Sequence, residues 1–378
     1  MKTANLILTA LALNLSLPSF SQAAGCCQGM GAAGLDGDWQ AIKGGSGPKV
    51  VEITNASFET SRDLFAELNA DFAGRWARKT GYVLTVNESH ASTEAQAHAI
   101  LLGAEPDIVT FDNASAIDEL SAKGKLLPLD WQERLPDHSA PFTTAVVFVV
   151  DKGNPKHIHD WSDLVADGVS VVTPNPETSG RGQWNYFSAW TYALHTLGSP
   201  DKARDFLSKL FQNTPVLNSS ARGSIETFTT KKIGDVLLVW ESDARLLVAQ
   251  STARQLEIVT PSSSILVEPP VAYLDHNIEK HVTSRVTISF LKYLYLTEAQ
   301  EIIARHGFRP RLSETAAKFQ TAFPQIKLFT VTEEFGSWAA AKKQHFEAGG
   351  IYESIVSKTK TVALLSPTTS SASVSQTQ

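Results

Sequence analysis

Four short turns rich in Ser, Thr and Gly hold the residues best suited to chemistry in this sequence. They span residues 55–61, 89–93, 173–180 and 218–224; each precedes a predicted helix, and most follow a predicted strand. The first backbone N–H groups of a helix have no partner inside the helix and carry a partial positive charge. Several such N-termini in one cleft can hold an anion without any net positive charge. A single turn of this kind indicates an ordinary helix cap, whereas four together favour an anion site.

The common sequence motifs of enzymes are missing. The sequence lacks G-x-x-x-x-G-K-[ST], G-x-S-x-G and H-E-x-x-H, and residues 180–182 (Gly-Arg-Gly) lack the third glycine of a dinucleotide-binding loop. His157 and His159 form an isolated pair in a polar loop, which is more typical of solvent-facing side chains than of metal ligands. We therefore expect no catalytic residue, no metal and no cofactor, and we expect a protein that is not an enzyme.

The turns lie between alternating predicted strands and helices. Strands are predicted at residues 50–53, 82–86 and 107–110, with helices between them. The first helix shows one apolar stripe at helical spacing, made of Leu64, Phe65, Leu68, Phe72 and Trp76. This β-α-β-α-β order predicts a parallel, doubly wound sheet, in which ligands bind beyond the carboxyl ends of the strands. Further strands are predicted at residues 145–150, 169–172, 236–240 and 256–259.

Composition limits the class of protein. The chain has 378 residues, of which 43% are hydrophobic, and this is enough for a large core and about two domains. Its net charge of −6 predicts no broad electropositive surface, so we expect no nucleic-acid partner. Cys26 and Cys27 are the only cysteines, and adjacent residues are too close for a disulfide.

Both ends of the chain are predicted to lie outside the folded body. An apolar stretch at residues 6–17 is too short to span a membrane, and a small-x-small site follows it, so residues 1–23 are predicted to be a signal peptide. Residues 23–26 also fit a lipobox, in which case the leader ends at residue 25 and a lipidated Cys26 tethers the protein to the membrane. Residues 24–49 are a predicted linker, and residues 359–378 a predicted disordered tail. We expect a periplasmic or extracytoplasmic protein.

Long runs of the sequence resemble the periplasmic sulfate-binding proteins, from about Val50 to about Ile355. The matching runs occur in the same order and include RLPDHSAPFTTAVVFVVDKGNPKHIHDWSDLVADGVSVVTPNPETSG, SARGSIETF, IGDVLLVWESDA, EIVTPSSSILVEPPV, FRPRL and AFPQIKLFTVTEEFGSW. The resemblance implies a type II periplasmic binding protein, an α/β fold with two lobes, doubly wound sheets and a hinge. It implies a monomer that holds dehydrated sulfate, or thiosulfate, in its cleft and delivers it to the permease of an ABC transporter. We place the first lobe at residues 50–142 with 271–358, and the second at residues 143–270.

The resemblance also implies a set of ligand contacts. Sulfate carries no proton at neutral pH, so an ideal pocket offers only donors, and a Trp indole is a donor without acceptor capacity. The plainer interpretation of Trp240 is a core side chain after an apolar strand. The implied donors are the backbone N–H groups of Glu59, Thr93, Gly180, Arg181 and Ala221, the Ser179 hydroxyl and the Trp240 indole N–H.

Several positions depart from the pattern of the family. Ala91 and Ser92 stand where the family has Gly-Gly, residues 111–114 replace an apolar run, Arg181 replaces a glycine, and Gln183 replaces an arginine. Two hypotheses follow for Arg181. Its guanidinium supplies in the site the charge lost at residue 183, or its side chain points to solvent and only its backbone N–H contacts the ligand.

Other functions compete with sulfate capture. Another oxyanion, such as molybdate or phosphate, is the nearest alternative, and hydrogen phosphate would need a buried acceptor that the Glu59 side chain could supply. Two alternatives come from other classes of protein. One is an enzyme on the same scaffold, and the other is a protein that binds sulfate and signals to a partner.

Overall fold

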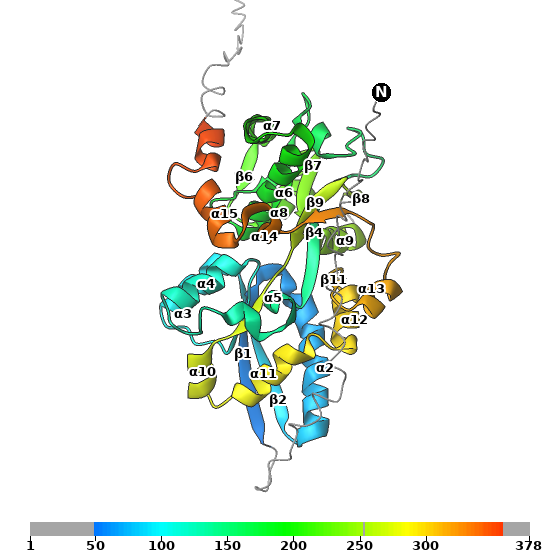
Figure 1. The fold of residues 1–378 in the computed structure, drawn as a ribbon. Coiled ribbons are helices and arrows are strands. Elements are labelled where there is room, and N and C mark those ends of the chain that lie inside the picture. Colours follow the sequence, from blue (N-terminus) through cyan, green and yellow to red (C-terminus); the bar gives the residue numbers. More distant parts are fainter. Residues whose placement is uncertain (1–48, 252–253, 358–378) are drawn as a thin grey trace, which may run out of the picture. The chain divides into compact units, whose positions relative to one another are not determined.

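The computed structural model describes residues 49–251 and 254–357 of the chain (Figure 1). The predicted signal peptide (1–23), the linker as far as residue 48, Cys26 and the predicted tail (359–378) lie outside the described residues. All described residues fall within one compact unit of the chain. In these segments, no helix is both long enough and apolar enough to cross a membrane.

The first sheet contains four strands in the order β10-β3-β1-β2. They are β1 (Val50–Phe58), β2 (Val83–Ala91), β3 (Ile108–Thr110) and β10 (Val271–Tyr273). β1 runs parallel to β2 and β3, as the alternating pattern predicts, whereas β10 is antiparallel to β3. The carboxyl ends of β1, β2 and β3 therefore lie at one edge of this sheet.

Helices cover both faces of the first sheet. The helix α2 (Arg62–Thr80) follows β1 after the 3-10 turn η1 (Glu59–Ser61), and α3 (Thr93–Leu101) and α4 (Ala114–Ala122) lie on the opposite side (Figure 1). All five residues of the predicted apolar stripe on α2 are buried, so that prediction is confirmed. Gly81 ends α2 with φ 75°, a left-handed conformation that favours glycine.

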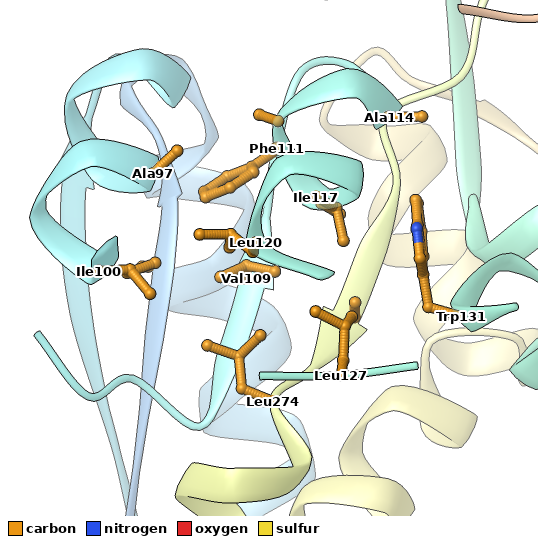
Figure 2. Packing of buried hydrophobic residues seen from close by; sticks show 13 residues of the cluster. Ala97, Ile100, Val109, Phe111, Ala114, Ile117, Leu120, Leu127, Trp131 and Leu274 are labelled. Atoms are coloured by element: carbon orange, nitrogen blue, oxygen red, sulfur yellow. The ribbon is translucent and has the colours of Figure 1, made fainter. Parts of the chain in front are cut away.

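Side chains from α3, α4 and β3 form the core beside this edge. Figure 2 shows Phe111, Ile117 and Leu120 close together with Trp131 to one side of them, and all four are almost fully buried. Phe111 opens the segment that departs from the family pattern. Its burial fixes the two residues that follow, Asp112 and Asn113, just beyond the end of β3.

The second sheet follows the order β12-β9-β4-β7-β5-β6, and β8 and β11 also pair with β4. β4 is buried along nearly its whole length, as its apolar sequence predicts. The strands are β4 (Phe142–Asp151), β5 (Val171–Pro174), β6 (Val216–Asn218), β7 (Val236–Trp240), β8 (Leu256–Val259), β9 (Ser263–Val267), β11 (Arg309–Pro310) and β12 (Lys327–Phe329).

Four main helices belong to the second sheet: α6 (Gly180–Leu197), α7 (Pro200–Gln212), α8 (Ala221–Thr229) and α9 (Glu241–Gln250). Three of them, α6, α8 and α9, begin just after β5, β6 and β7, respectively. Their N-termini therefore meet at one edge of the sheet. The short elements η2 (Trp131–Arg134), α5 (Pro136–Ser139) and η3 (Trp161–Val165) flank β4.

Both sheets are mixed: the predicted parallel arrangement is found for β1, β2 and β3, and antiparallel strands add to each sheet. β5 is parallel to β6 and β7, but β4 is antiparallel to β7, β8 and β9. Parallel neighbours need a crossover connection within one sheet. The chain reaches β4 and β10 by segments that pass from one sheet to the other, so no such crossover fixes their direction.

The C-terminal segment packs against elements of both sheets. After β10, the helices α10 (Asp275–Lys280), α11 (Ser284–Tyr293), α12 (Thr297–Arg305) and α13 (Ser313–Lys318) follow. β12 then pairs with β9, and α14 (Val331–Phe335) and α15 (Trp338–His345) pack on α6, where the rings of Trp184 and Trp338 lie 4.5 Å apart. The assignment of residues 271–358 to the first lobe stays a prediction, and we propose that the part from β12 onward belongs with the second.

Candidate anion-binding site

Three of the four turns begin helices with a serine cap. Ser92, Ser179 and Ser220 cap α3, α6 and α8, and each accepts a hydrogen bond from a backbone N–H in the first turn of its helix. The turn at residues 55–61 leads instead into η1, which has no side-chain cap. The capping interpretation is therefore right for these serines. A hydroxyl that accepts one bond still has its own proton to donate, so a cap can also bind an anion.

The N-terminus of α6 contacts the first lobe directly. Gly180 N donates to Glu94 Oε1 at 3.0 Å, and Trp184 Nε1 donates to the backbone oxygen of Asp112 at 2.6 Å. A Cβ atom on Gly180 would lie only 2.4 Å from Asp112 Oδ1, so a larger residue would force the side chains of Asp112 and Asn113 to move. Asp112 N in turn donates to Thr93 Oγ1 at 3.0 Å. These contacts bring the predicted residues Thr93 and Gly180 to one place.

The side chain of Arg181 points into the protein and is only 6% exposed. Its guanidinium pairs with Asp243 at the start of α9 and donates to Thr60 Oγ1 in η1. Its central carbon lies 3.8 Å from the ring centre of Trp240 and 5.3 Å from that of Phe58. The hypothesis that Arg181 points to solvent is therefore wrong. The cation lies inside the predicted site, but a carboxylate already balances its charge.

Trp240 lines a small cavity and is 1% exposed. Trp240 Nε1, Asn185 Oδ1 and Ser224 Oγ are buried and have no hydrogen-bond partner within the described part of the chain. These three residues line the cavity together with Arg181 and with Ala221, the first residue of α8. Buried polar groups are nearly always paired, so this cluster indicates a place for a ligand or water. The cavity measures about 10 Å³, which is room for about one water molecule.

Glu59 lies at the entrance of η1, opposite α8. Its carboxylate pairs with Arg222 Nη1 at 3.1 Å, and the Arg222 side chain is 75% exposed. Glu59 therefore reaches the residue next to Ala221, and its side chain is engaged with an exposed cation. This arrangement gives no support to Glu59 as the buried acceptor for hydrogen phosphate.

Two carboxylates that sequence reasoning did not place in the site lie next to the N-terminus of α6. Burial raises the pKa of Glu94 to about 7, and the nearby Asp112 charge adds to the shift. Burial also raises the pKa of Asp112, while the Arg181 charge opposes the rise. Glu94 could have been found from its position directly after Thr93. A third carboxylate, Asp243, which pairs with Arg181, could not have been found, because only the fold brings α9 to Arg181.

A layer of hydrogen-bonded polar side chains lies next to the turns, along β1, β2 and α2. Ser57 Oγ lies 2.7 Å from His90 Nδ1, and Glu88 accepts bonds from Ser57, Asn55 and Asn69. Burial raises the pKa of Glu88 to about 7 and lowers the pKa of His90. Ser57 is fully buried, so this Ser–His pair orients the ends of β1 and β2 and is closed to a substrate.

Comparison with known proteins identifies the class of protein to which this geometry belongs. The sequence matches the bacterial extracellular solute-binding proteins over residues 54–309. The chain belongs to this family. The solute-binding protein is 46% identical to the sulfate-binding protein of Escherichia coli over 308 residues, covering 81% of this chain and 93% of that one. It is 41% identical to a thiosulfate-binding protein of Pseudomonas aeruginosa over 314 residues, covering 83% and 95% of the two chains.

Solved structures agree with this family assignment. The sulfate-binding protein SubI from Mycobacterium tuberculosis matches with a TM-score of 0.70 and 27% identity, covering 79% of this chain and all of that one. The predicted two-lobe α/β fold is thus confirmed. In the segments that the structure describes, no group of three or more His, Cys, Asp or Glu side chains could hold a metal ion.

The fold gathers the predicted residues of the solute-binding protein along one seam between the two sheets. Thr93 and Gly180 meet through Glu94 and Asp112, and the cavity joins Arg181, Ala221 and Trp240. Glu59 reaches the same helix, α8, through Arg222. The predicted set of sulfate contacts itself stays a prediction.

Proposed function

We propose that this solute-binding protein captures sulfate or thiosulfate outside the cytoplasmic membrane and delivers it to the permease of an ABC transporter. The observation that carries the proposal is the buried indole N–H of Trp240, which lacks a partner in the described residues. It lies beside the first residue of α8 and the guanidinium of Arg181. An anion without protons suits such a set of donors.

Relatives support the choice of ligand. The curated relatives named above are a sulfate-binding and a thiosulfate-binding protein, and each aligns along nearly its whole length. We propose that Glu59, Thr93, Gly180, Arg181 and Ala221 contribute backbone N–H groups. Ser179 would donate its hydroxyl, because its oxygen already accepts from Gly182 N and its proton is left for the ligand.

Titration calorimetry of the protein with sulfate, thiosulfate, phosphate and molybdate tests this function. Phosphate belongs in the set because Asn185, whose Oδ1 is a buried acceptor without a partner in the described residues, is one of the residues that line the cavity, and an acceptor would suit a ligand with a proton. We expect sulfate or thiosulfate to bind most tightly, with weak dependence on salt, because the donors are buried dipoles rather than surface charges. Tighter binding of phosphate or molybdate would contradict the proposal.

We also propose export through the leader at residues 1–23, or a lipid tether at Cys26, and action as a monomer. Fractionation of cells that produce the wild type and a Cys26→Ser variant separates the two forms of export. Release of the variant from membranes into the soluble fraction would support the tether. A wild type that is already soluble would support cleavage after residue 23.

A further inference from the structure

The protein's own charged groups fill the seam where the anion is proposed to bind. The Glu94 carboxylate accepts a hydrogen bond from Gly180 N, one of the donors assigned to the ligand. The guanidinium of Arg181 covers the ring of Trp240. The remaining cavity of about 10 Å³ suits about one water molecule, so an oxyanion can enter only if these side chains move.

We propose that Glu94 is an internal competitor of the ligand, whose carboxylate occupies the place of an anion oxygen on the N-terminus of α6, so that binding of the oxyanion is coupled to uptake of a proton by Glu94. The inference rests on the proposed function. It assigns to the site a residue that competes with any anionic ligand.

The geometry sets the direction of this coupling. A carboxylate at Gly180 N is stabilised by the same N–H group and helix dipole that would hold the ligand. When a dianion binds there, an ionised Glu94 loses its donor and faces a like charge. A protonated Glu94 carries no charge and has a proton to donate to the anion. The protonated form is therefore the one that tolerates the ligand.

The charged groups around Glu94 affect its ionisation directly or through one another. Asp112, from the segment after β3, disfavours the ionised form of Glu94. Arg181 of α6 favours ionisation of Asp112, and Asp243 of α9 is paired with Arg181. On β2, below the site, Glu88 and His90 are bonded to side chains of the polar layer instead.

The titration range of Glu94 makes the coupling measurable near neutral pH. Its pKa is raised to about 7 by burial and by Asp112, and a bound dianion would raise it further. Below the free-state value the group is already protonated, and binding takes up no proton. Above it, binding takes up a proton, so affinity falls as the pH rises.

The test is calorimetric titration of sulfate, and separately of thiosulfate, into the wild type, Glu94→Gln and the control Glu105→Gln, at about pH 6 and about pH 8.5 in buffers of different ionisation enthalpy. Glu105 is an exposed carboxylate that pairs with Lys280, and Lys280 is not one of the residues of the proposed site. We expect the wild type and the control to bind about 30-fold more weakly at the higher pH, with uptake of close to one proton there. Glu94→Gln should bind equally well at both values and take up none.

Two results would overturn the inference. One is a wild type whose binding is independent of pH and involves no proton. This result needs no variant, because it is measured on the wild type alone. The other is a Glu94→Gln protein that keeps the pH dependence, because Asp112 would then be the group that titrates. If sulfate and thiosulfate bind none of the three proteins at either pH, the proposed function fails, and this outcome is distinct from both.

Discussion

At the scale of single residues, serine caps have two roles that a matched pair of variants can separate. Ser179 and Ser199 both cap helices of the second lobe, α6 and α7, by accepting a backbone N–H bond. Only Ser179 lies at the proposed anion site. The cap itself contributes to stability, whereas the free hydroxyl proton would contribute to binding.

Ser179→Ala should therefore weaken sulfate binding by about 1–3 kcal/mol, because it removes a donor to a buried dianion. Ser199→Ala should leave binding unchanged, although each variant loses about 1 kcal/mol of unfolding free energy with its cap. Titration calorimetry and denaturant unfolding measure the two effects. A Ser179→Ala protein that binds like the wild type would remove the basis for assigning ligand contacts residue by residue.

The pair of Arg181 and Asp243 is a second feature at this scale. Both side chains are about 93% buried, at 7% and 6% exposure, and each lies against the other. Removing one partner leaves a buried charge unpaired, which costs much more than losing an exposed pair.

Arg181→Met should lower the free energy of unfolding by about 3–5 kcal/mol, because Asp243 is then left charged and buried. The double variant Arg181→Met, Asp243→Asn should recover a large part of that loss. Arg204→Met is the matched control, since Arg204 pairs with the exposed Asp201, and it should cost less than about 1 kcal/mol. Denaturant unfolding checks all three. Equal losses in the single and double variants would argue against a coupled pair.

At the scale of elements, the packing of α15 on α6 places a histidine in an aromatic core. His345 is fully buried among rings that include Tyr186, Phe187 and Trp190, and its Nδ1 lies 2.8 Å from the Tyr186 hydroxyl. Burial lowers the pKa of His345 to about 4. The unfolded chain, with a pKa near 6.5, therefore binds more protons between these values, and acid destabilises the folded state.

We expect the contribution of His345 to the free energy of unfolding to fall by about 2–3 kcal/mol as the pH drops from about 6.5 to about 4. His345→Phe should not show this loss. The difference in unfolding free energy between the variant and the wild type should therefore change as the pH falls. His159→Gln changes an exposed histidine and should keep the slope of the wild type. Denaturant unfolding across this range tests the prediction. Parallel pH profiles for the wild type and His345→Phe would contradict it.

At the scale of the whole molecule, several contacts join the two lobes across the seam. Glu94 bonds to Gly180, Asp112 to Trp184, Thr60 to Arg181 and Glu59 to Arg222. Each contact links the first sheet or its helices to α6 or α8. A ligand held at the same helix N-termini would add to this set and favour the closed arrangement of the lobes.

Saturating sulfate should therefore reduce the radius of gyration in solution and stabilise the protein. At a free concentration of about 100 times Kd, the free energy of unfolding should rise by about 2.7 kcal/mol. Small-angle scattering and thermal unfolding measure the two effects, with chloride at equal ionic strength as the control. Stabilisation without any compaction would contradict the hinged-cleft account.

The sequence by itself determined much of this protein. Its periodicities located β1, α2, β2, α3, β4 and β7, because apolar spacing reports directly which side of an element is buried. The four turns and the resemblance pointed to one seam, since parallel strands end at a common edge. Local patterns are set by neighbouring residues, which is why these predictions were accessible from the chain alone.

Only the tertiary structure decided the direction of β4 and β10, the partners of β12 and the chemistry around Arg181. Asp243 follows Arg181 by 62 residues and Thr60 precedes it by 121 residues. No local pattern links residues so far apart, because their contact depends on how the two sheets meet. The same is true of Glu94, whose role follows from its hydrogen bond to Gly180, 86 residues further along the chain. The charge balance of a site is a property of the assembled fold, and spacing along the chain does not contain it.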